Sequence, residues 1–128
     1  MLHKNIVLLI LTLALVSCNQ KRDEAYYLTH PDKLGAAIEN CRALDNYTFE
    51  CDAVRAARTK LNVLLLQAHA SGQAFGRTIL QLQMQRAELQ KSFVKATATE
   101  KYELRQNINK LNLEVGTRIA VVRLLEPL

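Results

Sequence analysis

Three cysteines carry the most reactive side chains of this 128-residue chain, and the position of the first one is distinctive. Cys18 comes shortly after an apolar run, residues 6–16, which follows the positively charged Lys4. A positive residue followed by a short apolar run is typical of a secretory signal, and this run is too short to span a bilayer. The sequence therefore predicts that residues 1–17 are a signal peptide and that the rest of the chain is exported.

The segment Leu15-Val16-Ser17-Cys18 resembles the lipobox of bacterial lipoproteins. This resemblance implies that the Cys18 sulfur takes a diacylglyceryl group and that cleavage makes Cys18 the first mature residue. Each buried methylene contributes about 0.8 kcal/mol, so two or more acyl chains anchor a protein without a membrane-spanning helix. Asn19 resembles the residue at this position in outer-membrane lipoproteins, so we expect anchoring in the cell envelope, facing the periplasm, with the outer membrane favoured over the inner. The alternative is a plain signal peptide or an uncleaved anchor with an incidental cysteine.

The two remaining cysteines, Cys41 and Cys51, form an even pair that export would place in an oxidising compartment. We predict a disulfide between them, which would stabilise the fold by roughly 2.7 kcal/mol on the chain-entropy model for a loop of about eleven residues. The alternative is a pair of reduced core cysteines. No metal site is expected, because His30 and His69 lack the clustered spacing of zinc ligands.

Enzymatic chemistry has little support in the sequence. His69 and Ser71 lie two residues apart, but no acidic residue lies near in sequence to orient the histidine, and no Gly-x-Ser-x-Gly turn is present. The net charge of +5 is mixed with acidic residues, and the chain has no Trp, which argues against a nucleic-acid interface. We therefore expect a binding protein that is not an enzyme and has no cofactor beyond the covalent lipid on Cys18.

The segments that position these residues have helical periodicity throughout, so the sequence predicts an all-α fold. Residues 18–28 are expected to be the lipidated cysteine and a polar tether. A helical hairpin closed by the disulfide is expected over residues 29–71, with Cys41 in the last turn of its first helix and Cys51 in the first turn of its second.

Capping residues mark where both helices of this hairpin should begin. Thr29 and Asp32 have the spacing of a capping box, and Pro31 falls in the first turn, where its missing N–H does no harm. Thr48 is placed to cap the second helix.

A second, longer and coiled-coil-like hairpin is expected over residues 72–128, after a break or kink at the glycines of residues 71–76. Apolar residues recur there at alternating four- and three-residue steps, apart from one arginine in each helix. The expected seam consists of Phe75, Ile79, Leu82, Arg86, Leu89 and Phe93 in one helix, and Leu104, Ile108, Leu111, Val115, Arg118, Val122 and Leu125 in the other. The turn is expected at residues 96–99, with Thr97 and Glu100 at capping-box spacing. Because this turn lacks Gly and Pro, one long bent helix is the alternative. The two seam arginines would pair with acids of the facing helix, mark a partner site, or extend their stems past the seam edge.

The string YYLTHPDKL of residues 26–34, followed by Cys41 and Cys51, resembles the EexN family of conjugative-plasmid entry-exclusion lipoproteins. That family has a lipobox, a short polar tether, a Tyr-Tyr-x-x-His-Pro-acid segment and two cysteines flanking a helix boundary. The likeness covers about residues 18–57. The chain departs from the family in the loop of residues 42–50, in the Asp-Ala pair after the second cysteine, and in the long hairpin that follows.

The resemblance implies a lipid-anchored protein that blocks conjugative entry by contacting a type IV secretion or mating-pair component. Tyr26, Tyr27, His30 and Pro31 are the expected contact, since tyrosines offer large rigid contact areas. The alternative is that both tyrosines pack as a hydrophobic staple at the helix start. In the exclusion function the second hairpin is expected to support homo-oligomerisation or a second contact. A rival function is a structural envelope or type IV secretion assembly lipoprotein, in which the seams build a helical scaffold and no exclusion occurs.

Overall fold

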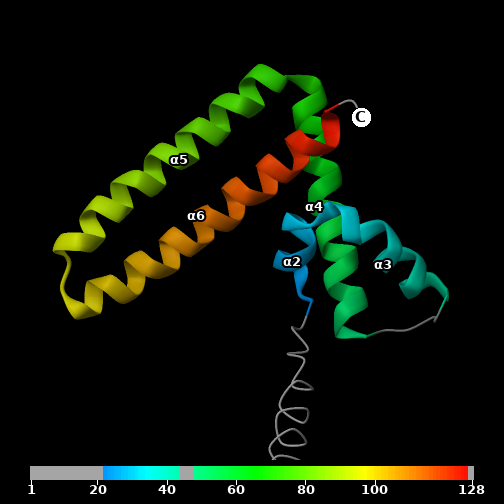
Figure 1. The fold of residues 1–128 in the computed structure, drawn as a ribbon, viewed down its shortest axis with the longest axis horizontal. Coiled ribbons are helices and arrows are strands. Elements are labelled where there is room, and N and C mark those ends of the chain that lie inside the picture. Colours follow the sequence, from blue (N-terminus) through cyan, green and yellow to red (C-terminus); the bar gives the residue numbers. More distant parts are fainter. Residues whose placement is uncertain (1–21, 44–47, 127–128) are drawn as a thin grey trace, which may run out of the picture.

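The protein is all-helical in the parts that its computed structural model describes, residues 22–43 and 48–126 (Figure 1). Its helices in these ranges are α2 (Glu24–Thr29), α3 (Pro31–Ala43), α4 (Phe49–Ala70), α5 (Gly72–Lys95) and α6 (Ala98–Leu125). This confirms the predicted all-α fold. None of these described helices is long and apolar enough to cross a membrane. The predicted signal peptide and Cys18 lie outside the described residues.

Helix α2 occupies part of the segment that the sequence predicted as tether. It begins at Glu24, and the side chain of its N-cap, Asp23, accepts a hydrogen bond from the Tyr26 amide at 2.9 Å. Tyr27 and Leu28 are almost fully buried, with 0% and 1% of their surface exposed. The tether prediction is therefore wrong for residues 24–28, because these two large side chains fold the segment against the core.

Helix α3 begins at Pro31, as predicted, but not with the predicted cap. The Thr29 hydroxyl donates backwards to the carbonyl oxygens of Ala25 at 3.0 Å and Tyr26 at 3.2 Å. It therefore bonds the last turn of α2 and does not cap α3. These two carbonyls lie within one turn of Thr29, so its hydroxyl can bond to them locally. The capping box expected from Thr29 and Asp32 is therefore wrong.

Helices α3 and α4 form the predicted hairpin, and the predicted disulfide between Cys41 and Cys51 joins them, with their Cα atoms 5.6 Å apart. The Thr48 hydroxyl accepts from the Cys51 amide at 3.3 Å, so it caps α4 as expected. The cap and the disulfide therefore hold the same turn.

Ser71 alone separates α4 from α5. Its backbone is extended, and its hydroxyl accepts from the Ala74 amide at 3.2 Å, which caps α5. Gly72 and Gly76 lie inside α5, so the chain turns at the serine and not at the glycines.

Helices α5 and α6 run antiparallel and project from the body formed by α2, α3 and α4 (Figure 1). The chain turns between Lys95 and Ala98, so the hairpin prediction is confirmed over the single bent helix. The Glu100 carboxylate accepts from both the amide and the hydroxyl of Thr97, at 2.8 and 2.7 Å. These bonds lower the pKa of Glu100 and close the turn without Gly or Pro.

The predicted seam of α6 fails at its C-terminal end. Val122 is 38% exposed, whereas Val121 and Thr117 are fully buried. Helix α6 packs against α2, α3 and α4 as well as α5, and its buried residues are Val115, Thr117, Ala120 and Val121. A heptad pattern describes packing between two helices only. The additional helices that contact α6 shift its buried face by one residue, from Val122 to Val121. The main core cluster consists of Tyr27, Leu28, Leu34, Val54, Ala57, Leu61, Leu64, Ala68, Phe75 and Val121.

Candidate partner-binding site

The four predicted contact residues are divided between the surface and the core. His30 is exposed, and Tyr26 and Pro31 are half-buried. Tyr27 is 0% exposed, so the structure places it beneath the surface as a core residue. The contact surface that remains is therefore the outer side of α2 and its junction with α3.

Tyr26 and His30 form a stack on that surface. Their ring centroids are 4.6 Å apart with an interplanar angle of 15°, and the Arg22 guanidinium carbon lies 5.6 Å from the centroid of Tyr26. Nδ1 of His30 is 2.9 Å from the Tyr26 carbonyl oxygen. A carbonyl oxygen only accepts hydrogen bonds, so Nδ1 carries the proton and the neutral ring has its lone pair at Nε2. The His30 ring is thus held against Tyr26 both by the ring stack and by a hydrogen bond to the Tyr26 backbone.

Tyr27 connects this surface to the disulfide-bonded hairpin. Its ring meets Tyr26 edge to face at 5.3 Å, and its hydroxyl donates to Oε1 of Glu50 at 2.6 Å. Burial and, to a lesser degree, the neighbouring Glu50 carboxylate raise the pKa of Tyr27 to about 12, while Arg22 opposes this shift. These contacts therefore fix the position of the Tyr26–His30 stack relative to the first turn of α4.

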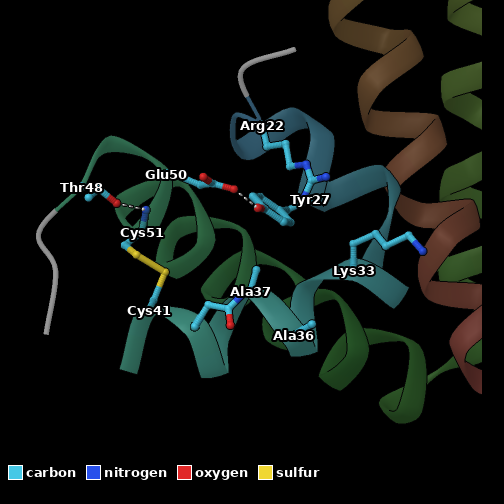
Figure 2. A pocket seen from close by; sticks show the side chains of 10 residues that line it. Arg22, Tyr27, Lys33, Ala36, Ala37, Cys41, Thr48, Glu50 and Cys51 are labelled. Atoms are coloured by element: carbon cyan, nitrogen blue, oxygen red, sulfur yellow. Dashed lines mark hydrogen bonds between the residues drawn. A yellow bond between two sulfur atoms is a disulfide. The ribbon is translucent and has the colours of Figure 1, made fainter. Parts of the chain in front are cut away.

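A cavity of about 380 Å³ lies beside Tyr27, between the start of α2, helix α3 and the start of α4 (Figure 2). The Cys41–Cys51 disulfide forms part of its wall. The lining residues are Arg22, Tyr27, Lys33, Ala36, Ala37, Asn40, Cys41, Thr48, Glu50 and Cys51. The cavity therefore combines polar groups at its rim with alanines and a disulfide in its wall.

The charges of the cavity are separated in space. Figure 2 shows Arg22 and Lys33 on one side of the Tyr27 ring and Glu50, with Thr48, on the other. Lys33 also pairs with Asp32 at 3.2 Å, and this hydrogen bond lowers the pKa of Asp32. Such an arrangement can hold a ligand that carries a negative group near the two basic side chains.

Sequence reasoning missed the polar residues of this cavity. Arg22 belongs to a charged segment that was expected to be tether, and Glu50 was noticed only as a loop residue. The two are 28 positions apart, and α2 brings them together only because it folds onto α4. The one usable signal was Tyr27, which follows an acidic N-cap and could have been expected to need a hydrogen-bond partner once buried.

His69 and Ser71, the other residues considered in the sequence, lie outside the cavity. Ser71 caps α5, and His69 is exposed at the end of α4. Within residues 22–43 and 48–126, no group of three or more histidine, cysteine or acidic side chains could hold a metal ion.

The seam arginines find partners of two kinds. Arg86 donates to Asn112 of the facing helix at 3.3 Å. Arg118 pairs with Glu114 of its own helix at 3.1 Å, and its guanidinium carbon lies 5.2 Å from the centroid of Phe75. The expectation of an acidic partner on the facing helix is therefore wrong for both.

Comparison with protein-family models, curated proteins and solved structures gives no match for this chain.

Proposed function

We propose that this protein is an envelope lipoprotein, anchored by acyl chains on Cys18, that binds a component of a conjugation or type IV secretion apparatus and thereby excludes entry of a related element. The observation that carries the proposal is the Tyr26–His30 stack, in which a half-buried tyrosine ring and an exposed histidine ring lie together on α2 and its C-cap beside a polar cavity. Rigid aromatic side chains next to polar groups are typical of binding hot spots.

The start of α2 at Glu24 sets how far this surface lies from the lipid. Residues 19–23 are all that separates Cys18 from the helix, and five residues reach roughly 18 Å when fully extended. The stack would therefore stay within a short distance of the membrane, where confinement raises its effective concentration against another envelope component. We expect the partner to present its contact surface close to the same membrane.

Conjugation frequency tests this function directly. A plasmid-free recipient that expresses the chain should take up a cognate element orders of magnitude less often than a recipient without it. Cys18→Ser should abolish acylation, release the protein from the membrane fraction and restore uptake, because confinement is lost. Intact mass and acyl labelling would verify the lipid. Unchanged uptake by a recipient in which the protein is present and lipidated would contradict the proposal.

The projecting α5–α6 arm favours a second candidate, a scaffold lipoprotein of the envelope or of a type IV secretion assembly. Large apolar side chains are exposed along the arm, namely Leu80 at 57%, Met84 at 64%, Val94 at 77% and Tyr102 at 68%. A scaffold would use this surface for assembly. Leu80→Ser with Met84→Ser should then impair transfer out of a donor cell, and a recipient that expresses the wild-type chain should show no exclusion.

A further inference from the structure

The cavity between α2, α3 and the start of α4 has the composition of a binding site and has no role in the helix packing described above. Its volume of about 380 Å³ lies at the lower end of the range found for ligand sites, roughly 300–1,000 Å³. It opens next to the Tyr26–His30 stack, because Arg22 both lines the cavity and lies over the Tyr26 ring. A partner that contacts the stack would therefore also reach the cavity.

Arg22 is the charged group with unused binding capacity. Among the described residues, no carboxylate forms an ion pair with it. It lies over the Tyr26 ring, 5.6 Å from the centroid, and donates one side-chain hydrogen bond to Tyr27, which leaves its other donors for a ligand. A guanidinium presents several donors in a planar fork that matches a carboxylate. Lys33 also lines the cavity, but its ammonium group points away from Tyr27 and pairs with Asp32 at the surface (Figure 2).

Glu50 is the group that opposes an anion here. Its Oε1 accepts the Tyr27 hydroxyl at 2.6 Å, and Figure 2 shows the Tyr27 ring between Glu50 and the two basic side chains. The hydroxyl donor partly compensates the carboxylate charge, and the Arg22 guanidinium lies on the other side of the Tyr27 ring from Glu50. A ligand with one negative group and a short apolar stem fits this distribution, since Ala36 and Ala37 line the wall below.

We propose that the cavity binds the carboxylate of an acidic side chain presented by the protein partner, with Arg22 as its principal contact. This inference rests on the proposed function, because it names the chemistry by which the partner is recognised. A glutamate is the better fit, since its two methylenes would pack on Ala36 and Ala37 while its carboxylate meets the guanidinium.

The test uses the full-length chain in detergent micelles, with the α-amide of N-acetyl-glutamate as the probe, because its side-chain carboxylate is then its only negative group. Amide NMR shifts are the readout. This glutamate probe should give saturable shifts at residues 22, 36 and 40, and the α-amide of N-acetyl-glutamine, which has no carboxylate, should give none. Arg22→Gln should weaken the binding roughly tenfold, as expected for one charged hydrogen-bonded pair. Arg58→Gln is the matched control, because Arg58 is exposed on α4 and outside the cavity.

Equal shifts with the two probes, or unchanged affinity in Arg22→Gln, would overturn the inference. Larger amide shifts or tighter binding with inorganic phosphate than with the glutamate probe would also overturn the inference, because the cavity would then select phosphate. The conjugation assay judges the proposed function separately. Exclusion by the wild-type chain without carboxylate binding would contradict only this inference, whereas carboxylate binding without exclusion would contradict the proposed function.

Discussion

The Tyr27 hydroxyl lies 2.6 Å from Oε1 of Glu50, and this hydrogen bond joins α2 to the first turn of α4 across 23 residues of sequence. The same turn contains the Thr48 cap and Cys51 of the disulfide. One small region therefore fixes the helix that carries the Tyr26–His30 stack, and the stability of this region should decide whether the stack keeps its position.

Tyr27 should give the protein a distinct alkaline transition. Its pKa is raised from 10.0 to about 12, chiefly by burial and then by Glu50. The neutral phenol is favoured in the folded state, so this stabilisation is complete below pH 10 and is lost as the pH rises through 12. The loss should be on the order of 2 kcal/mol. Urea unfolding between pH 8 and 12 should show it in the wild type and not in Tyr27→Phe; parallel curves for the two proteins would contradict the assignment.

The Cys41–Cys51 disulfide should contribute a large share of the stability. Replacing both cysteines by serine should lower the free energy of unfolding by about 2.7 kcal/mol, because the unfolded chain is no longer constrained. The urea midpoint measures this loss. Wild-type protein treated with a reductant should show the same midpoint as the double variant, and a reductant should not alter the variant. A double variant as stable as the oxidised wild type would rule out this role.

The features that the sequence predicted correctly depend on neighbouring residues. Pro31 is suited to the first position of α3, because the amide hydrogen that it lacks would have no partner in the helix. Thr48 caps α4 by accepting from the amide three residues further on. Thr97 and Glu100 close the turn of the arm with the same three-residue spacing. The disulfide depended only on compartment and on two cysteines near one turn. Each of these follows from chemistry within a few positions of the chain.

The features that were missed depend on contacts between distant segments. Helix α2 is too short for a periodic pattern, and it forms because Tyr27 and Leu28 reach the core. The cavity has no signature because Arg22 and Glu50 meet only after that packing. The buried face near the end of α6 was assigned wrongly because a heptad pattern assumes one partner helix, whereas α6 contacts α2, α3 and α4 in addition to α5.

Adjacent valines of α6 test that shifted face. Val121 is 0% exposed and Val122 is 38% exposed, so the two positions differ in burial and not in chemistry. Val121→Ala should destabilise the protein by about 2 kcal/mol, since it leaves a cavity in the core. Val122→Ala should change the stability by less than about 0.5 kcal/mol. Urea unfolding of the two variants decides between the faces, and the reverse order would restore the heptad seam predicted from sequence.

The Tyr26–His30 stack should be needed for exclusion more than for folding. Tyr26→Ala removes a half-buried ring together with its contacts to His30 and Arg22, while Tyr27 and its bond to Glu50 remain. In a recipient cell this variant should raise uptake of the cognate element at least tenfold over the wild type, the usual scale of a binding hot spot. Tyr102→Ala is the control, because Tyr102 is 68% exposed near the start of α6. Figure 1 shows that this end of α6 lies at the tip of the arm, away from α2. Immunoblots of the membrane fraction must show equal amounts of both variants. If Tyr26→Ala excludes as well as Tyr102→Ala at equal abundance, the contact lies elsewhere on the protein. The reason is that removing the Tyr26 ring deletes most of the aromatic surface on which recognition by α2 would depend.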